Sequence, residues 1–290
     1  MSVVPANIES QNLAVGSADH RRLLGRFFLE THIDYVPEQM QWPALANEEL
    51  ARLRSLPFWQ EAVSTENVTS NTVAAAAALE ADPLVRRAIE LQGFEEMRHA
   101  HLLMALTSHY RIPVEPPPRF TPRSLENDFL FAGFGECFDS FFAFGLFALA
   151  RESGFFPAGL VKVFEPVMQE EARHILFFVN WVKYRRTQLP WWRRPAYRLR
   201  CARIIVKQLA SRVKTARTMG KPRPEAAGSS ENFTLTAHQD LGTEVTLRRL
   251  LGLCLKENAR RMAKYDSRLR RPRLVPGIAG VLLRVLPAGV

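Results

Sequence analysis

The chain has 290 residues, 47% of them hydrophobic, so it can bury the core of one large domain or two small ones. Its formal net charge of +10 favours an acidic partner or an anionic surface. The three cysteines, Cys137, Cys201 and Cys254, form no C-x-x-C pair, which argues against a disulfide framework, a zinc site or a rubredoxin-like centre. Residues 1–12 lack the basic and apolar regions of a signal peptide, so we expect a cytoplasmic location.

Residues 1–56 predict an N-terminal extension with short helices. A first helix is expected from Ala18 to His32, where apolar side chains share one helical face. An irregular stretch at 36–43 precedes a second helix from Asn47 to Leu56. Pro57, a favoured first-turn residue, then opens a longer helical region.

Two long helices are predicted from Pro57 to Glu80 and from Pro83 to Tyr110. The first carries Glu66, and the second carries Glu96 and His99 as a Glu-x-x-His motif. Residues three apart on a helix project from nearly the same face, so this carboxylate and imidazole can bind one ion. Both glutamates lie about 23 Å from the break between the helices at 1.5 Å per residue, so antiparallel packing would bring them together.

The same arrangement recurs 75 residues further along the chain. An apolar stretch from Phe129 to Ala150 carries Glu136, and the helix expected from Ala158 to Arg186 carries Glu171 and His174. Glu136 and Glu171 again lie symmetrically about the break between their helices. A buried carboxylate is costly without a partner, so Glu136 is expected to meet a metal ion or a cation.

The connection between the second and third of these helices is long and rich in proline. Short turns alone would make four helices run alternately up and down, whereas a long connection allows a crossover that leaves two of them parallel. From Tyr110 to Asn127 the chain can extend roughly 56 Å, which exceeds the about 32 Å length of the bundle. The predicted fold is therefore all-α, with a four-helix bundle over residues 57–186.

Four helices that present Glu, Glu-x-x-His, Glu and Glu-x-x-His predict a carboxylate-bridged site for two metal ions. The six candidate ligands are Glu66, Glu96, His99, Glu136, Glu171 and His174. One Glu-x-x-His motif alone is more often a solvated helix face, but two copies with matched upstream glutamates favour metal. Asp139 is the alternative ligand on the third helix.

The motif neighbours Glu95, Glu170, Arg98 and Arg173 point away from the predicted metal face. We interpret them either as residues that support the ligands from behind or as surface ion pairs.

Small residues at helical spacing predict a cavity beside the metal ions. Gly133, Ser140 and Ala143 lie one or two turns from Glu136, among phenylalanines that would make the cavity apolar. Thr69 and Ser70 are candidates for proton relay beside the first helix's ligand. Close helix packing is the alternative explanation for the small residues.

At these motifs, over roughly residues 57–186, the sequence resembles the ferritin-like di-iron carboxylate superfamily. Glu66 followed by Glu95-Glu96-x-Arg98-His99 is closest to the di-iron N-oxygenases that oxidise arylamines. Val167 stands where that family carries an additional histidine ligand. The resemblance implies a ferritin-like bundle, two iron ions cycling between Fe2+ and Fe3+, dioxygen as co-substrate and an external electron donor. The ligand chemistry would also suit manganese.

Beyond the bundle the sequence becomes basic, with fourteen Lys and Arg residues from Lys183 to Arg223 and no acidic residue over 172–224. Residues 187–217 predict an amphipathic helical extension. Its apolar face comprises Ala202, Ile205, Val206, Leu209 and Val213. Its basic face comprises Arg200, Arg203, Lys207, Lys214 and Arg217. This basic face would be simply solvated, or the helix would bind an anionic membrane surface, an acidic carrier protein or nucleic acid.

Residues 218–232 predict a flexible linker, and residues 233–290 predict a C-terminal helix and a basic, apolar tail. The helix is expected from Thr236 to Tyr265. Its inward residues would be Leu247, Leu250, Leu251 and Leu255.

The leading functional hypothesis is a non-haem di-iron oxidase or oxygenase, cytoplasmic or peripheral at the membrane. It would use dioxygen for N- or C-oxygenation of an apolar substrate, either a small molecule or a carrier-bound one. Two alternatives stay open: a ferroxidase or other iron-handling ferritin-like protein, and a tRNA-modifying di-iron hydroxylase. A homodimer is compatible with the sequence.

Overall fold

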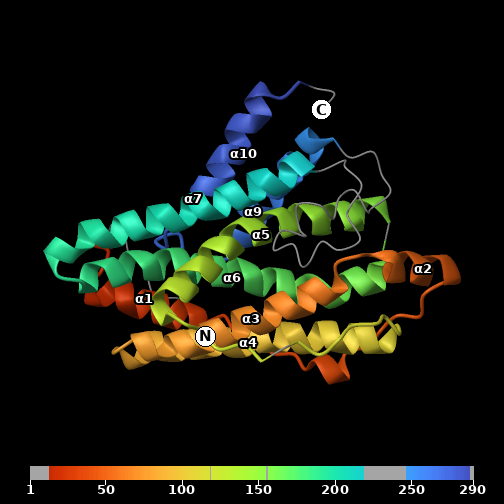
Figure 1. The fold of residues 1–290 in the computed structure, drawn as a ribbon, viewed down its shortest axis with the longest axis horizontal. Coiled ribbons are helices and arrows are strands. Elements are labelled where there is room, and N and C mark those ends of the chain that lie inside the picture. Colours follow the sequence, from red (N-terminus) through yellow and green to blue (C-terminus); the bar gives the residue numbers. More distant parts are fainter. Residues whose placement is uncertain (1–12, 118, 155, 219–245, 288–290) are drawn as a thin grey trace, which may run out of the picture.

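The computed structural model describes residues 13–117, 119–154, 156–218 and 246–287. Within these ranges the chain forms nine α-helices and no β-strand, which confirms the predicted all-α class (Figure 1). Residues 219–232 of the predicted linker and residues 233–245, which include the expected start of the C-terminal helix, lie outside the described ranges.

The N-terminal extension forms α1 (Ala18–Glu30), a 3₁₀ turn at Pro37–Gln39 and α2 (Asn47–Ser55). The Ser17 side chain caps α1 by accepting a hydrogen bond from the backbone N–H of His20 at 3.1 Å. Apolar side chains of α1 pack into the main core, so this helix covers one side of the long helices.

The first long pair consists of α3 (Trp59–Ala76) and α4 (Pro83–His109). Asp82 begins α4, where its Oδ1 accepts hydrogen bonds from the N–H groups of Leu84 and Val85. The two helices approach so closely that a Cβ at Gly93 would lie 3.0 Å from the backbone of Ala74. This close antiparallel packing sets the ligand-bearing turns of the two helices against each other.

The second long pair consists of α5 (Leu125–Ser153) and α6 (Ala158–Gln188). Gly154 ends α5 with a φ of 66°, a left-handed conformation that glycine adopts without a steric penalty. Figure 1 shows α4 and α5 running in the same direction, with the connection between them returning along the helices. The four helices α3 to α6 therefore lie side by side in one body.

Helix α5 is long and apolar enough to cross a membrane by length and composition, and it is the one such helix among the described residues. More than half of its most apolar window is buried inside the protein. A core helix of this kind passes the same test, so α5 is weak evidence for a membrane span.

The C-terminal part forms α7 (Arg194–Thr218), α9 (Leu247–Met262) and α10 (Leu274–Val285). The predicted apolar face of α7 turns inward only in part, because Val206 and Val213 are exposed whereas Leu209 is half-buried and packs against the core. The side that packs on α5 is instead formed by Tyr197, Cys201, Gln208 and Arg212. The prediction for α9 is correct at Leu250 and Leu251, which are buried, and wrong at Leu247, which is exposed.

The polar side chains of α7 turn inward because they satisfy backbone groups of α5. Gln208 Nε2 donates to the carbonyl of Phe131 at 2.8 Å, and Arg212 Nη2 donates to the carbonyl of Gly135 at 3.2 Å. Periodicity alone cannot anticipate such contacts between helices far apart in sequence.

Candidate metal centre

Four helices bring the predicted ligands into one region between them. Glu66 lies on α3, Glu96 and His99 on α4, Glu136 on α5, and Glu171 and His174 on α6. Donor atoms of Glu96, His99, Glu171 and His174 all lie within 4.8 Å of one another. These four buried residues can therefore hold a metal ion, as the paired motifs predicted.

The Nδ1 atom of His99 faces carboxylates from three helices. It lies 3.3 Å from Glu171 Oε1, 3.6 Å from Glu96 Oε2 and 3.8 Å from Glu66 Oε2. The Glu66 side chain is 25% exposed, whereas those of Glu96 and His99 are almost wholly buried. Solvent therefore approaches the cluster from the side of Glu66.

Glu136 lies in the same charged environment. Burial raises the pKa of Glu136 well above its ordinary value, and the charges of Glu96 and Glu171 raise it further. Both Glu136 carboxylate oxygens are buried without a hydrogen-bond partner among the described residues. The alternative ligand Asp139 accepts a hydrogen bond from Arg212 at 2.5 Å. Glu136 rather than Asp139 is therefore the acid on α5 that is available to bind a cation.

The hydrogen bonding of the cluster's donor atoms fits a metal site. Five of its buried atoms have no hydrogen-bond partner in the described part of the chain: Glu96 Oε1, His99 Nδ1, His174 Nδ1 and both oxygens of Glu136. Buried polar groups are nearly always hydrogen-bonded, so a group of exceptions in one place requires an explanation such as an ion. Carboxylate oxygens and imidazole nitrogens together suit iron or manganese.

The titratable groups of the cluster hold protons that a cation would displace. Burial raises the pKa of Glu66 to about 7, although the nearby His99 imidazole opposes the shift. Burial lowers the pKa of both His99 and His174, but the surrounding glutamates outweigh it and raise each pKa well above its ordinary value. Protons on these groups balance part of the buried negative charge.

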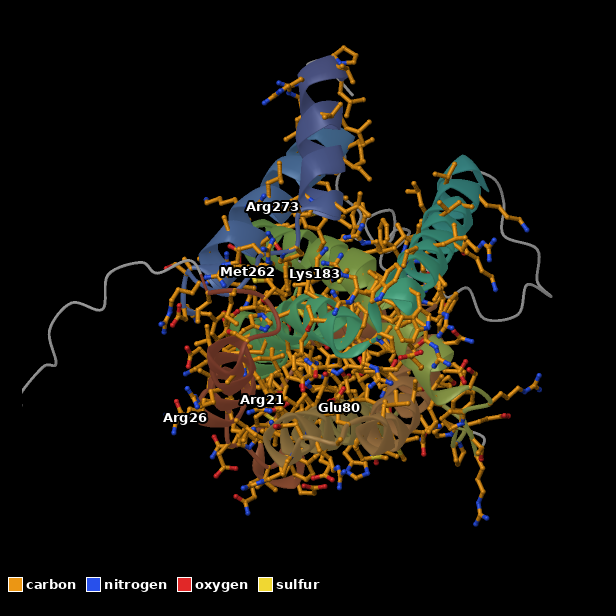
Figure 2. All side chains as sticks on the ribbon, turned by 90° about the vertical axis from the view of Figure 1, so that its left-hand side faces the viewer. Arg21, Arg26, Glu80, Lys183, Met262 and Arg273 are labelled. Atoms are coloured by element: carbon orange, nitrogen blue, oxygen red, sulfur yellow. The ribbon has the colours of Figure 1, made fainter. Side chains whose placement is uncertain are left out.

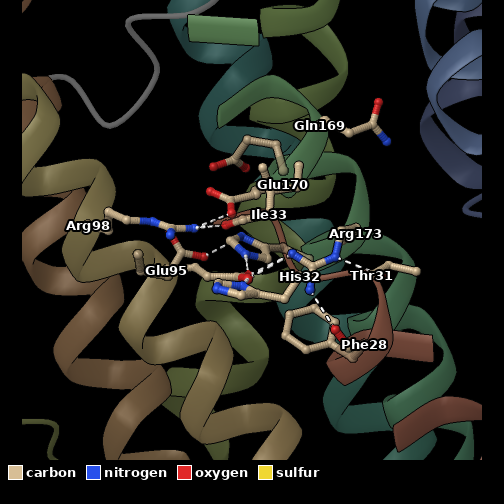
Figure 3. Close-up of polar contacts among 12 residues, drawn as sticks. Phe28, Thr31, His32, Ile33, Glu95, Arg98, Gln169, Glu170 and Arg173 are labelled. Atoms are coloured by element: carbon tan, nitrogen blue, oxygen red, sulfur yellow. Dashed lines mark hydrogen bonds and ion pairs between the residues drawn. The ribbon is translucent and has the colours of Figure 1, made fainter. Parts of the chain in front are cut away.

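The outer nitrogen of His99 is held by a buried network that includes Glu170 and Arg98. Figure 3 shows these two residues beside Ile33. His99 Nε2 lies 2.9 Å from Glu170 Oε2, which also accepts a hydrogen bond from the Tyr35 hydroxyl at 3.0 Å. Arg98 forms an ion pair with the other oxygen of Glu170 and donates to the backbone carbonyls of Ile33 and Tyr35. This arrangement turns the Nδ1 atom of His99 toward the carboxylates.

A matching network holds His174. His174 Nε2 lies 2.8 Å from Glu95 Oε2, and Arg173 Nη1 donates to both oxygens of Glu95 at 2.8 and 3.0 Å. His32 Nδ1 lies 2.6 Å from Glu95 Oε1. Glu95 and Glu170 are fully buried, so the alternative prediction of surface ion pairs is wrong, and they support the ligands from behind.

Sequence reasoning missed His32 and Tyr35, which follow α1 and join the two networks. His32, Glu95 and Glu170 lie close enough to form a second cation site. Arg173 and Arg98 already neutralise the two carboxylates, which explains this group without a metal. No local pattern marked His32 or Tyr35, because their partners lie more than 60 residues away in the sequence.

Two cavities meet at the cluster. The first has a volume of about 230 Å³, and apart from Glu66 and His99 its lining is apolar, with Trp59, Leu106 and Phe164 among its walls. The second, of about 480 Å³, has a mixed lining. We call it the polar cavity because its walls include the polar residues Glu61, Thr69, Thr72, Asp139, Gln208 and Arg212. Glu66, Ala143, Val167 and Met168 line both cavities. The cluster therefore adjoins one apolar cavity and one cavity of mixed polarity.

The predicted cavity residues have different positions. Ala143 lines both cavities, and Ser140 lines the polar one while donating a hydrogen bond to Glu171 Oε2 at 2.8 Å. Gly133 instead packs against the ring of Phe178, which a Cβ there would approach to 2.3 Å. Gly133 therefore allows close helix packing, whereas Ser140 and Ala143 line a cavity.

The two candidate proton-relay residues also differ. Thr69 lines the polar cavity beside the ligands. Ser70 is buried, and its hydroxyl donates to the backbone carbonyl of Asn67 within α3 at 2.9 Å.

Comparison with known proteins adds no relative. No protein-family model matches the chain, and neither a curated protein nor a solved structure matches it significantly.

Proposed function

We propose that the chain is a non-haem di-iron protein with a ferritin-like bundle, α3 to α6, that uses dioxygen to oxidise an apolar organic substrate. The observation that carries this proposal is the cluster of buried carboxylate and imidazole atoms without hydrogen-bond partners. The two iron ions would be held by Glu66, Glu96, His99, Glu136, Glu171 and His174. The parallel course of α4 and α5 supports the ferritin-like arrangement.

The protein groups around the ligands prepare the site for this chemistry. Two ferrous ions, when bound, supply electrons to dioxygen. Glu170 and Glu95 orient the two imidazoles, and Arg98 and Arg173 fix those carboxylates. Ser140 holds one oxygen of Glu171 by its hydrogen bond. The ligands are therefore positioned before any metal arrives.

The apolar cavity supports an organic substrate. Its volume of about 230 Å³ exceeds the roughly 150 Å³ of an engineered apolar cavity that binds benzene. A molecule that fills it would meet Glu66 and His99 at one end and hydrocarbon side chains elsewhere. The lining favours an uncharged, apolar molecule or the apolar end of a larger one.

The polar cavity supports a separate route for water, protons and metal ions. Thr69, Glu61 and Asp139 line it together with four of the candidate ligands. A site with one apolar and one polar approach suits an oxygenase better than an iron store, which needs no apolar cavity. The ferroxidase alternative would show as oxygen consumption without an organic product, in a cage of about megadalton size.

The proposal is tested by anaerobic loading with ferrous iron, followed by oxygen and a panel of apolar substrates. We expect two iron ions per chain and a product whose mass has changed by oxidation, detected by mass spectrometry. Amines, hydrocarbons and acyl-carrier conjugates in the panel would separate N-oxygenation from C-oxygenation. Binding of no iron under these conditions would overturn the proposal. Tight, salt-sensitive tRNA binding with a modified tRNA product would favour the hydroxylase alternative.

A further inference from the structure

The outward side of α7 carries an apolar stripe. Leu199, Val206 and Val213 follow one another at intervals of seven residues and are all exposed, Val206 by 64%. Seven residues nearly complete two helical turns, so these side chains form one line along the helix. The line lies opposite the side that packs on α5. We call these three residues the α7 stripe.

Aromatic and basic side chains extend the α7 stripe. Trp191 and Trp192 lie in the 3₁₀ turn Trp191–Arg193 just before the helix and are 74% and 63% exposed. Arg203, Lys207 and Lys214 are exposed along one edge of the stripe. The sequence has no acidic residue from 172 to 224, so all the charged side chains of α7 itself are cationic.

We propose that this side of α7 binds the surface of an anionic lipid bilayer, with the helix lying in the plane of the interface. A helix with Lys and Arg beside a line of Trp, Leu and Val residues has the composition of interfacial helices. The apolar residues would enter the boundary between headgroups and acyl chains, and Arg203, Lys207 and Lys214 would meet the anionic headgroups. This inference does not depend on the metal centre.

The observations favour a bilayer over other acidic partners. Nucleic acid would engage the basic residues but would leave Trp191, Trp192 and the α7 stripe in water. An acidic protein would need a complementary groove for a convex helix. Helix α10 also exposes apolar side chains, Val281 and Val285, and both views place it on the same side of the molecule as α7 (Figures 1 and 2).

The test is sedimentation of the full-length chain with vesicles of phosphatidylcholine, with and without 30% phosphatidylserine as the probe composition, together with tryptophan emission. We expect binding to the anionic vesicles that weakens with salt, and a blue shift from Trp191 and Trp192. The triple variant R203E/K207E/K214E should bind at least tenfold more weakly. The triple variant L199S/V206S/V213S should also bind at least tenfold more weakly, because it removes the apolar insertion.

A control variant, R26E/R87E/K264E, changes the net charge by the same amount on exposed positions of α1, α4 and the segment after α9. Arg26 lies on the side of the molecule away from α7 in Figure 2. This control should bind like the parent. The proposal is overturned if the parent does not bind anionic vesicles at low salt, or if the control and R203E/K207E/K214E lose binding equally. Undiminished vesicle binding by L199S/V206S/V213S would also overturn the proposal, since the helix would then bind the membrane through electrostatic attraction alone.

Discussion

His174 Nδ1 on α6 lies 2.8 Å from Glu96 Oε1 on α4, yet neither atom has a hydrogen-bond partner among the described residues. Two buried polar atoms this close, without the geometry of a hydrogen bond, could both bind one metal ion. The opposite nitrogen of the same ring is fully engaged by Glu95 at 2.8 Å. The His174 imidazole is thus held in place through Nε2, whereas its Nδ1 atom is available to a metal ion.

Removing single ligands should lower the metal content. We expect two iron ions per chain in the parent and one or none in Glu96→Ala or His174→Ala, with loss of oxygen consumption. Elemental analysis of the purified chain after anaerobic iron loading measures this directly. Both variants keeping two ions and the full oxidation rate would contradict the proposed ligand set.

A matched pair on α5 tests which acid is the ligand. Glu136→Gln should lose metal, because both of its oxygens are buried without hydrogen-bond partners among the described residues. Asp139→Asn should keep two ions, because Asp139 pairs with Arg212. The iron content of the two variants decides which acid is the ligand, provided that both variants have the same melting temperature and are therefore equally well folded. The reverse pattern would make Asp139 the ligand.

The carboxylates behind the histidines should tune metal affinity without binding the metal. Glu170→Gln and Glu95→Gln keep the side-chain volume but remove the charge that accepts from His99 and His174. Substitutions of such supporting residues typically cost 10–100-fold in metal affinity. Competition against a metallochromic indicator gives the dissociation constants. Glu90→Gln, an exposed change on α4, serves as the control and should leave affinity unchanged.

Metal uptake should release protons and weaken as the pH falls. The raised pKa values of His99, His174, Glu66 and Glu136 mean that the folded chain holds protons which a cation must displace. Since the pKa of Glu66 is about 7, affinity should fall as the pH drops from 8 to 6. Calorimetry in two buffers with different ionisation enthalpies counts the protons. If the ligands were already deprotonated before the metal binds, binding would release no protons and the metal affinity would not depend on pH in this range.

Filling the apolar cavity should separate substrate oxidation from iron binding. Ala143→Phe narrows the point where the two cavities meet, so it should block conversion of the apolar substrate or shift it to smaller molecules. Iron content should stay at two, although overpacking can cost about 1–3 kcal/mol, so the melting temperature is checked first. Ala51→Phe on the exposed side of α2 is the control. A folded, iron-loaded Ala143→Phe chain that converts substrate at the parent rate would place the substrate elsewhere.

The close contact of α3 with α4 should be essential to the site. Gly93→Leu would push its side chain against the backbone of Ala74, separate the helices and lower both the melting temperature and the iron content. Gly252→Ala on α9 meets no atom within 4 Å and should be neutral or slightly stabilising, because alanine favours helix. Thermal unfolding followed by circular dichroism compares the two. Equal melting temperatures of the two variants would show that α3 and α4 can move apart without a loss of stability.

The sequence by itself determined the helical class and the four-residue cluster. Glu96 with His99 and Glu171 with His174 could be predicted because their spacing is local, and helix geometry fixes which side chains share a face. The positions of Glu66 and Glu136 followed from counting residues back from each turn, since antiparallel helices bring equal heights together.

Only the tertiary structure decided what surrounds those ligands. Glu95 and Glu170 directly precede the candidate ligands Glu96 and Glu171 in the sequence, and their burial depends on Arg173, Arg98 and the segment after α1. The inward side of α7 is determined by hydrogen bonds from Gln208 and Arg212 to backbone carbonyls of α5. Val206, which the periodicity placed on the apolar face, is exposed as a result. Each of these outcomes rests on contacts between residues far apart in the chain, and hydrophobic periodicity carries no information about such pairs.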